Sequence, residues 1–348
     1  MVVERPGGRA GYRIHGWGGP LVWDDLPERR PGSGEVLVEV DACGIGLTVL
    51  NCINGNLSDD PALLPRVPGH ELAGRVVALG AGAEPSLLGR SVVAYFYLHC
   101  GECANCVGGM EPRCLRLGGW VGVHRDGGYG PTTVLPQRNV VVIPDAVDPV
   151  EATVIPDAVA TPVHVSRRAE IGAADRVAVL GAGGGVGAHM VQVARLHGAA
   201  VIGLERNPEK LATLEGLGVT AAPVGDSLPD PASLFGGARP TVVVDLVGAA
   251  ATLAWSVSAV APGGRVVLLT TFRDVTTRLD PRELVFAESS IMGSRYASVA
   301  EVAEAATLVA DGRIRPVIGT VVDPDGVPAV HEAIRGGSLV GRGALRWR

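Results

Sequence analysis

The sequence is poor in aromatic residues and contains no long hydrophobic run. Aromatic side chains make up 4% of its 348 residues, and no stretch approaches the about 20 consecutive apolar residues of a membrane-spanning helix. The N-terminal residues include charges and glycines where a secretion signal needs an apolar core. We therefore expect a soluble, cytoplasmic protein without a membrane partner.

An excess of basic charge is also lacking. The formal net charge is −6, and the 30 lysines and arginines are scattered along the chain. Proteins that bind nucleic acids usually gather such residues into a basic stripe. We therefore expect a small-molecule ligand and no nucleic-acid partner.

Glycine and proline, in contrast, are abundant. The chain has 49 glycines and 25 prolines, and 47% of its residues are hydrophobic, which is typical of a globular protein with many tight turns. Its length exceeds what one hydrophobic core usually organises, so we expect two domains.

The hydrophobic pattern changes near residue 160. Before it, alternating or short apolar runs at 35–40, 75–79 and 91–96 predict strands separated by long loops. After it, strands alternate with helices, which predicts a parallel, doubly wound sheet. The predicted strands are 176–180, 200–204, 241–247 and 265–269, and the predicted helices are 186–197 and 209–217.

Four of the six cysteines are crowded into one short segment. Cys100, Cys103, Cys106 and Cys114 could reach a single tetrahedral centre, which would then have four sulfur ligands. Four thiolates suit zinc and leave no open coordination position, so we expect a structural zinc that fixes a loop. The alternative is four reduced cysteines or local disulfides.

A glycine-rich turn follows the strand predicted at 176–180 and leads directly into a helix. Such a turn lets the backbone approach a pyrophosphate, which the helix N-terminus then attracts. We expect it to bind a dinucleotide through Gly181, Gly183, Gly184, Gly185, Val186 and Gly187.

Glu205 lies about twenty residues beyond these glycines, at the end of the next predicted strand. A carboxylate there accepts hydrogen bonds from the adenosine ribose and repels a 2′-phosphate, which favours NAD over NADP. Arg206 beside it could instead attract that phosphate, so NADP(H) stays possible. Glu205 could also be an ordinary solvated carboxylate.

Together these features resemble the zinc-containing alcohol dehydrogenase branch of the medium-chain dehydrogenase/reductase family, from about Pro31 to the C-terminus. The matching segments are Gly69-His70-Glu71, the cysteine segment, Asp126-Gly127-Gly128-Tyr129, Ile155-Pro156-Asp157, the glycine turn, Val244-Asp245-Leu246-Val247-Gly248 and Gly341-Arg342-Gly343.

The resemblance implies an α/β protein with two domains. One is a GroES-like, mostly-β catalytic domain at 1–158, with a structural-zinc lobe at 97–116 and a C-terminal return at 297–348. The other is a Rossmann cofactor domain at 159–296. We also expect a homodimer or a homotetramer.

The catalytic-zinc motif of the family is altered in this chain. The ligand cysteine of the usual pattern falls on Gly46, a supporting aspartate on Val49 and the proton-relay histidine on Asn51. In a simple alignment Cys43 lies too early and Cys52 too late to replace the ligand, although a shifted loop could still present one of them. His70, Glu71 and Asp157 could still hold a metal, but without thiolate softness. Alternatively these residues are a relic of the motif.

The family also implies roles for residues outside these motifs. Thr48 would bind the substrate hydroxyl, with Phe96 and Tyr95 lining the substrate pocket. The cofactor would further contact Thr161, Lys210, Val247 and Arg342, the last near the pyrophosphate. Alternatively, Thr161, Lys210 and Phe96 are ordinary surface or core residues without a role in binding.

Three functions fit these residues, and of them we favour the first. The first is NAD(P)(H)-dependent interconversion of an alcohol and a carbonyl compound, with Thr48, His70, Glu71, Asp157 and Asn51 at the catalytic site. The second is metal-independent reduction of an activated C=C–C=O or iminium bond, in which Thr48 or Tyr95 contacts the oxygen. The third is a catalytically silent nucleotide-binding protein.

Overall fold

The computed structural model describes residues 9–270 and 275–348. The N-terminal segment from which the absence of a secretion signal was predicted lies almost wholly outside them. Within the described residues, no helix is both long and apolar enough to span a bilayer. The chain divides into two compact units, the first formed by residues 1–157, 297–312 and 318–348 and the second by residues 158–296 and 313–317.

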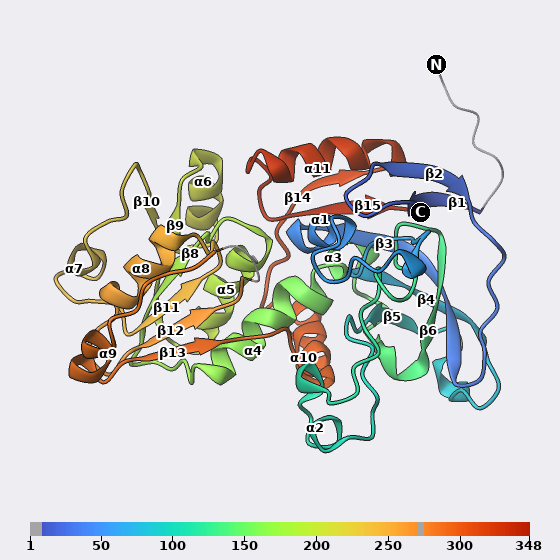
Figure 1. Cartoon of the computed structure of the whole chain (residues 1–348), viewed down its shortest axis with the longest axis horizontal. Helices are drawn as coiled ribbons and strands as arrows, with labels where there is room; N and C mark the ends of the chain where they lie inside the picture. Colours follow the sequence, from blue (N-terminus) through green and yellow to red (C-terminus); the bar gives the residue numbers. More distant parts are fainter. Residues whose placement is uncertain (1–8, 271–274) are drawn as a thin grey trace. The chain divides into compact units, whose positions relative to one another are not determined.

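The first unit is built on a seven-stranded sheet (Figure 1) with the strand order β14-β15-β3-β4-β5-β7, in which β6 also pairs with β3. A separate hairpin joins β1 and β2. The strands are β1 (Ala10–Ile14), β2 (Leu21–Asp25), β3 (Glu35–Ile45), β4 (Leu72–Leu79), β5 (Ser91–Ala94), β6 (Thr132–Pro136), β7 (Val140–Val142), β14 (Ile318–Val322) and β15 (Arg342–Arg346).

The helices of this unit are short, apart from those in its C-terminal part. The α-helices are α1 (Leu47–Ile53), α2 (Ala104–Val107), α3 (Pro149–Ala152), α10 (Val299–Ala310) and α11 (Val327–Arg335). Single 3₁₀ turns lie at Pro61–Leu63, Pro85–Leu87, Glu111–Arg113, Gln137–Asn139 and Pro324–Gly326. A π-helical segment, Ile155–Val159, carries Asp157 at the end of the long N-terminal part of the unit.

Long β3 is the central strand of the first unit. Its side chains alternate between half-buried and fully buried from Glu35 onward, which is the pattern of a strand with one face on the core. The predicted strand at 35–40 is therefore present, but it continues five residues further, to Ile45. That extension brings Gly44 and Gly46 to the edge of the candidate site.

The second unit contains a six-stranded sheet in which every pairing is parallel, with the order β10-β9-β8-β11-β12-β13. This order is that of the Rossmann fold. The strands are β8 (Arg176–Leu180), β9 (Ala200–Glu205), β10 (Thr220–Pro223), β11 (Val242–Asp245), β12 (Arg265–Leu268) and β13 (Ser290–Gly293). The helices are α4 (Ala160–Arg168), α5 (Gly185–Leu196), α6 (Pro208–Gly216), α7 (Pro231–Leu234), α8 (Ala250–Ala259) and α9 (Pro281–Ala287).

The apolar sequence of β8 reflects a sheet that is covered on both faces. Val177 and Val179 belong to one buried cluster, whereas Ala178 and Leu180 belong to another. Both the β-rich first part and the doubly wound second part predicted from the sequence are confirmed. The strand predicted at 241–247 ends at Asp245, because the Asp245 carboxylate accepts hydrogen bonds from two backbone N–H groups of the following turn.

The observed division of the chain differs from the predicted one at residues 313–317, which pack with the second unit. There Gln192 exchanges two hydrogen bonds with the backbone of Arg315, at 2.8 and 3.0 Å. The Val317 N–H lies 3.1 Å from Nε2 of His189. Polar side chains of α5 thus bind residues 313–317, and no sequence pattern in that segment predicts its packing with the second unit.

Candidate functional site

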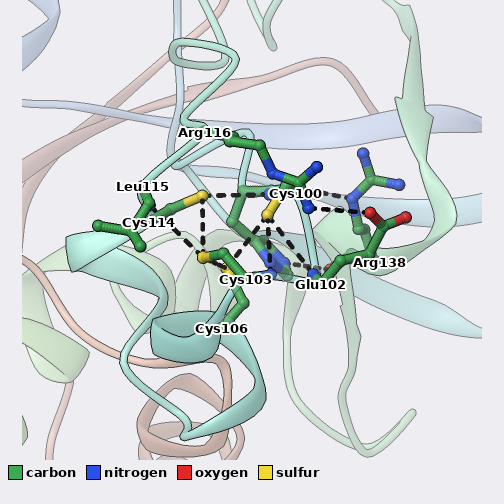
Figure 2. Close-up of polar contacts among 9 residues, drawn as sticks. Cys100, Glu102, Cys103, Cys106, Cys114, Leu115, Arg116 and Arg138 are labelled. Atoms are coloured by element: carbon green, nitrogen blue, oxygen red, sulfur yellow. Dashed lines mark hydrogen bonds and ion pairs between the residues drawn. The ribbon is translucent and has the colours of Figure 1, made fainter.

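The four clustered cysteines converge on one point (Figure 2). Their Sγ atoms are 3.9 Å apart for Cys100 and Cys106, 3.5 Å for Cys103 and Cys106, and 4.0 Å for Cys103 and Cys114. A tetrahedral zinc with Zn–S bonds near 2.3 Å places its sulfur ligands about 3.8 Å apart. All four thiols are free, and their spacing far exceeds the about 2.05 Å of a disulfide. The geometry therefore fits a closed four-sulfur zinc site.

Backbone amides donate hydrogen bonds to these sulfur atoms. The N–H groups of Glu102 and Cys103 donate to Cys100 Sγ at 3.4 and 3.3 Å. These donors lower the pKa of Cys100 to about 6, whereas burial raises the pKa of Cys106 to about 12. A bound dication is needed to hold all four groups as thiolates.

A second group of potential metal ligands consists of His70, Glu71 and Asp157. One ligand atom from each lies within 4.8 Å of the others, and His70 Nε2 is 3.6 Å from Asp157 Oδ2. All three residues are buried. Among the described residues, neither ring nitrogen of His70 has a hydrogen-bond partner. The structure thus brings the three predicted residues together.

Strand register explains how this group forms. Strand β15 pairs antiparallel with β3 with Gly343 opposite Ile45, so Arg342 comes beside Gly46. On the other side of β3, Leu72 of β4 lies opposite Cys43, and Gly44 N–H donates to the Glu71 carbonyl at 2.9 Å. Gly44 and Gly46 lie on one face of the chain, because side chains alternate along a strand.

The two glycines leave space that neighbouring side chains fill. A Cβ at Gly44 would lie 2.9 Å from Glu71 Oε2. A Cβ at Gly46 would lie 2.0 Å from Arg342 Nη1 and 2.5 Å from Arg342 Cζ. The guanidinium therefore takes the space that the family's ligand cysteine would need.

Both carboxylates of the group hold this guanidinium. Arg342 Nε donates to Glu71 Oε1 at 3.1 Å, and Nη2 lies 2.9 Å from both Glu71 Oε1 and Asp157 Oδ2. Arg342 is only 4% exposed. The structure places the charged group of Arg342 on the two carboxylates. The contact of Arg342 with the cofactor pyrophosphate stays a prediction.

Burial and charge oppose each other within this cluster. Burial raises the pKa of Glu71, and the adjacent Arg342 counteracts part of that rise. Burial disfavours the charged form of Arg342, but Glu71 and Asp157 outweigh this and raise its pKa. The guanidinium is therefore always charged, and its positive charge is balanced locally by carboxylate.

The cluster does not fit the four-ligand zinc centre of the family. Three ligand atoms are near one another, but Gly46 supplies no thiolate and Arg342 fills the space of that missing side chain. The Asp157 oxygen that faces His70 already accepts a hydrogen bond from Arg342. A metal would have to share this oxygen with a guanidinium.

Thr48 and Asn51 lie on α1, just beyond Gly46, and both are half-buried. Asn51 Oδ1 accepts a hydrogen bond from Asn56 Nδ2 at 3.2 Å. An amide does not titrate, so Asn51 cannot replace the relay histidine of the family.

The two predicted pocket residues differ in their surroundings. The Phe96 ring lies against His70, with ring centroids 4.3 Å apart. Tyr95 is fully buried, and its hydroxyl donates to the Ala297 carbonyl at 2.7 Å. In this structure the Tyr95 hydroxyl proton is thus donated to the backbone, and the contact of Tyr95 with a substrate stays a prediction.

The glycine turn of the second unit connects β8 to α5, which begins at Gly185. Gly181 has a φ of +73°, which only glycine adopts readily. A Cβ at Gly183 would lie 2.3 Å from Lys210 Cβ, and one at Gly187 would lie 2.3 Å from the Gly181 carbonyl oxygen. The glycines are thus required for the tight turn and for close packing of the helix, as in a dinucleotide site.

Glu205, the last residue of β9, is held beside this turn. Its carboxylate accepts hydrogen bonds from Gly183 N–H at 3.1 Å and from Arg206 N–H at 2.7 Å. Lys210 is buried on α6, and Val247 lies next to Gly181 after β11. The carboxyl ends of β8, β9 and β11 thus bring together these predicted cofactor residues.

Thr161, also predicted to contact the cofactor, is a buried residue of α4. Arg206 is exposed at the end of β9. The ion pairs of Arg342 with Glu71 and Asp157 are the feature that sequence reasoning missed. The available signal was the alternation of Gly44 and Gly46 together with the Gly341-Arg342-Gly343 segment.

Comparison with known proteins agrees with this architecture. Residues 32–145 match the alcohol dehydrogenase GroES-like domain, and residues 185–311 match the zinc-binding dehydrogenase family. The L-galactonate-5-dehydrogenase of Escherichia coli strain K12 is 31% identical over 298 residues, which cover 84% of this chain and 85% of that protein. An acryloyl-coenzyme A reductase of Sulfurisphaera tokodaii is 26% identical over 351 residues, 98% of each chain.

Among solved structures, a thermostable alcohol dehydrogenase from Pyrobaculum aerophilum with bound cobalt and zinc superimposes with a TM-score of 0.86. It is 29% identical, and the match covers 96% of this chain and 99% of that one. The chain therefore belongs to the alcohol dehydrogenase-like branch of the medium-chain dehydrogenase/reductase family and is an oxidoreductase of that family.

Proposed function

We propose that this protein uses NAD(P)H to reduce an activated double bond, an α,β-unsaturated carbonyl compound or an iminium ion. For the unsaturated carbonyl, hydride adds to the β-carbon and the displaced electron pair moves onto the carbonyl oxygen. The electron pair then returns to form a C–H bond at the α-carbon, with a proton from solvent water. Thr48 would donate a hydrogen bond to the carbonyl oxygen, where charge develops.

The observation that carries this proposal is the guanidinium beside Gly46. An unactivated alcohol must lose its hydroxyl proton as hydride leaves, and a Lewis-acid metal makes this loss easier. Here Arg342 fills the space of the ligand cysteine and is neutralised by Glu71 and Asp157. Asn51 offers no titrating group for a proton relay. A conjugated substrate is already activated toward hydride, so it needs neither a Lewis-acid metal nor a proton relay.

Interconversion of an alcohol and a carbonyl compound, which the sequence alone favoured, is the competing function. The retained Thr48 favours it, as do the names of two relatives, a galactonate dehydrogenase and an alcohol dehydrogenase. The name of a third relative, an acryloyl-coenzyme A reductase, agrees with reduction of a conjugated bond. A silent protein would bind NAD(H) and turn over neither substrate.

The test compares turnover of a simple ketone and a cyclic enone, with and without a chelator. We expect chelator-resistant enone reduction, which Thr48→Ala lowers about 10²-fold by removing the hydrogen bond to the developing oxyanion. Thr320→Ala, an exposed site on β14, is the matched control and should change little. Chelator-sensitive turnover that both His70→Ala and Asp157→Ala abolish would contradict the proposal.

We also propose NAD(H) as the preferred cofactor and one structural zinc per chain, at the four cysteines. Glu205 would accept hydrogen bonds from the adenosine ribose, and its charge would repel a 2′-phosphate. Lys210 is the only lysine of the sequence, so cofactor protection of its ε-amine from acylation, followed by peptide mass spectrometry, gives a readout independent of turnover.

We expect NADH to bind about tenfold more tightly than NADPH, a difference of about 1.4 kcal/mol. A fluorescence titration measures both affinities, and Glu205→Gln should reduce the preference. If NADPH binds tenfold more tightly instead, Arg206 and not Glu205 decides the choice.

A further inference from the structure

We propose that Arg342 is the permanent cation of the His70–Glu71–Asp157 cluster and that it keeps this cluster free of metal. The inference deepens the proposed function and rests on it for the role of the site in hydride transfer. Its test, however, measures metal content and not turnover.

The first argument is spatial. The Arg342 guanidinium lies where a side chain at position 46 would project, with Nη1 only 2.0 Å from an ideal Cβ there. A ligand at position 46 and this arginine conformation therefore exclude each other. A ligand side chain at position 46 would require the guanidinium to move.

The second argument concerns the donor atoms that remain. A metal bound by His70 and Asp157 would use Asp157 Oδ2, the oxygen that lies 3.6 Å from His70 Nε2. The same oxygen accepts a hydrogen bond from Arg342 Nη2 at 2.9 Å. A dication at this oxygen would lie next to a guanidinium in a buried site, where the repulsion between two positive charges is poorly screened.

The third argument is that the arginine is built into the sheet. Arg342 begins β15, which pairs with β3 on one side and β14 on the other. Its guanidinium bonds to both Glu71 and Asp157, so moving it would leave two buried carboxylates without their shared cation. Breaking such a buried pair is strongly destabilising. The arginine therefore stays in place when a metal ion competes.

The experiment measures the number of zinc ions bound per full-length chain. The protein is incubated with excess Zn²⁺, desalted and analysed by inductively coupled plasma mass spectrometry. We expect one ion per wild-type chain and two per Arg342→Ala chain. Adding Asp157→Ala to that variant should return the count to one. Arg335→Ala, which removes an exposed arginine paired with Glu332, is the matched control and should stay at one.

A second variant restores the missing ligand. Gly46→Cys with Arg342→Ala should bind Co²⁺ at the cluster and show thiolate-to-cobalt absorption beyond that of the cysteine lobe. Two ions per wild-type chain, one of them lost in His70→Ala, would overturn the proposal. So would a folded Arg342→Ala protein that still binds one ion. If Arg342→Ala does not fold, the wild-type count and its His70→Ala control decide the question.

Discussion

The two clusters of potential metal ligands in the first unit differ in whether they keep a complete set of ligands. In the cysteine lobe, four sulfur atoms keep the spacing of a tetrahedral zinc site. In the His70–Glu71–Asp157 cluster, three donors remain and an arginine fills the fourth position. Where one ligand is missing, another side chain can thus fill its space and pair with the carboxylates that remain.

The backbone around each cluster accounts for this difference. The cysteine lobe consists of loops, one short helix, α2, and the 3₁₀ turn Glu111–Arg113, and it contributes no strand to the sheets of the described residues. Such a segment depends on a metal for its shape. In the second cluster, His70 and Glu71 directly precede β4 and Arg342 begins β15, so paired strands fix these side chains without a metal. Asp157 lies on the π-helical segment Ile155–Val159. The sheet could therefore tolerate a substitution that the lobe could not.

The largest effect is expected from Cys103→Ser in the lobe. We predict loss of the zinc and a decrease of about 4 kcal/mol or more in the free energy of unfolding, which is the range reached when a structural metal is lost. Chemical denaturation together with a zinc assay measures both. Cys52→Ala, at a buried cysteine outside the lobe, should cost about 1 kcal/mol and keep the zinc. Equal losses in the two variants would show that the lobe has no special dependence on metal.

A smaller effect is expected from Gly46→Ala in the second cluster. The added methyl group would overlap the Arg342 guanidinium, and overpacking of this kind costs about 1–3 kcal/mol. Gly16→Ala is the matched control, because a Cβ there meets no atom within 4 Å, and it should change stability by less than about 0.5 kcal/mol. Thermal melts compare the two. If both are neutral, the guanidinium does not lie beside Gly46.

The sequence predicted the elements of the second unit well. A continuous apolar strand at 176–180 followed by a glycine turn is typical of a dinucleotide-binding fold, and β8 begins and ends as predicted. Boundaries were less accurate where a side chain ends the strand, as Asp245 does by binding the next turn. The association of residues 313–317 with the second unit depends on contacts with α5 that leave no local pattern.

The candidate site was only partly predictable. The loss of the ligand at Gly46 and the retention of His70, Glu71 and Asp157 could be read from the motif. The position of Arg342 could not, because it depends on the pairing of β15 with β3 across almost 300 residues of sequence. Long-range strand register, and not the local motif, decides which cation lies in this cluster.

The most direct test of this account is anomalous scattering at the zinc absorption edge from crystals of the wild-type protein. We predict one peak per chain, surrounded by Cys100, Cys103, Cys106 and Cys114. Electron density at the other cluster should show the Arg342 guanidinium against Glu71 and Asp157. A second peak bonded to His70 and Asp157, with Arg342 turned away, would contradict the central claim.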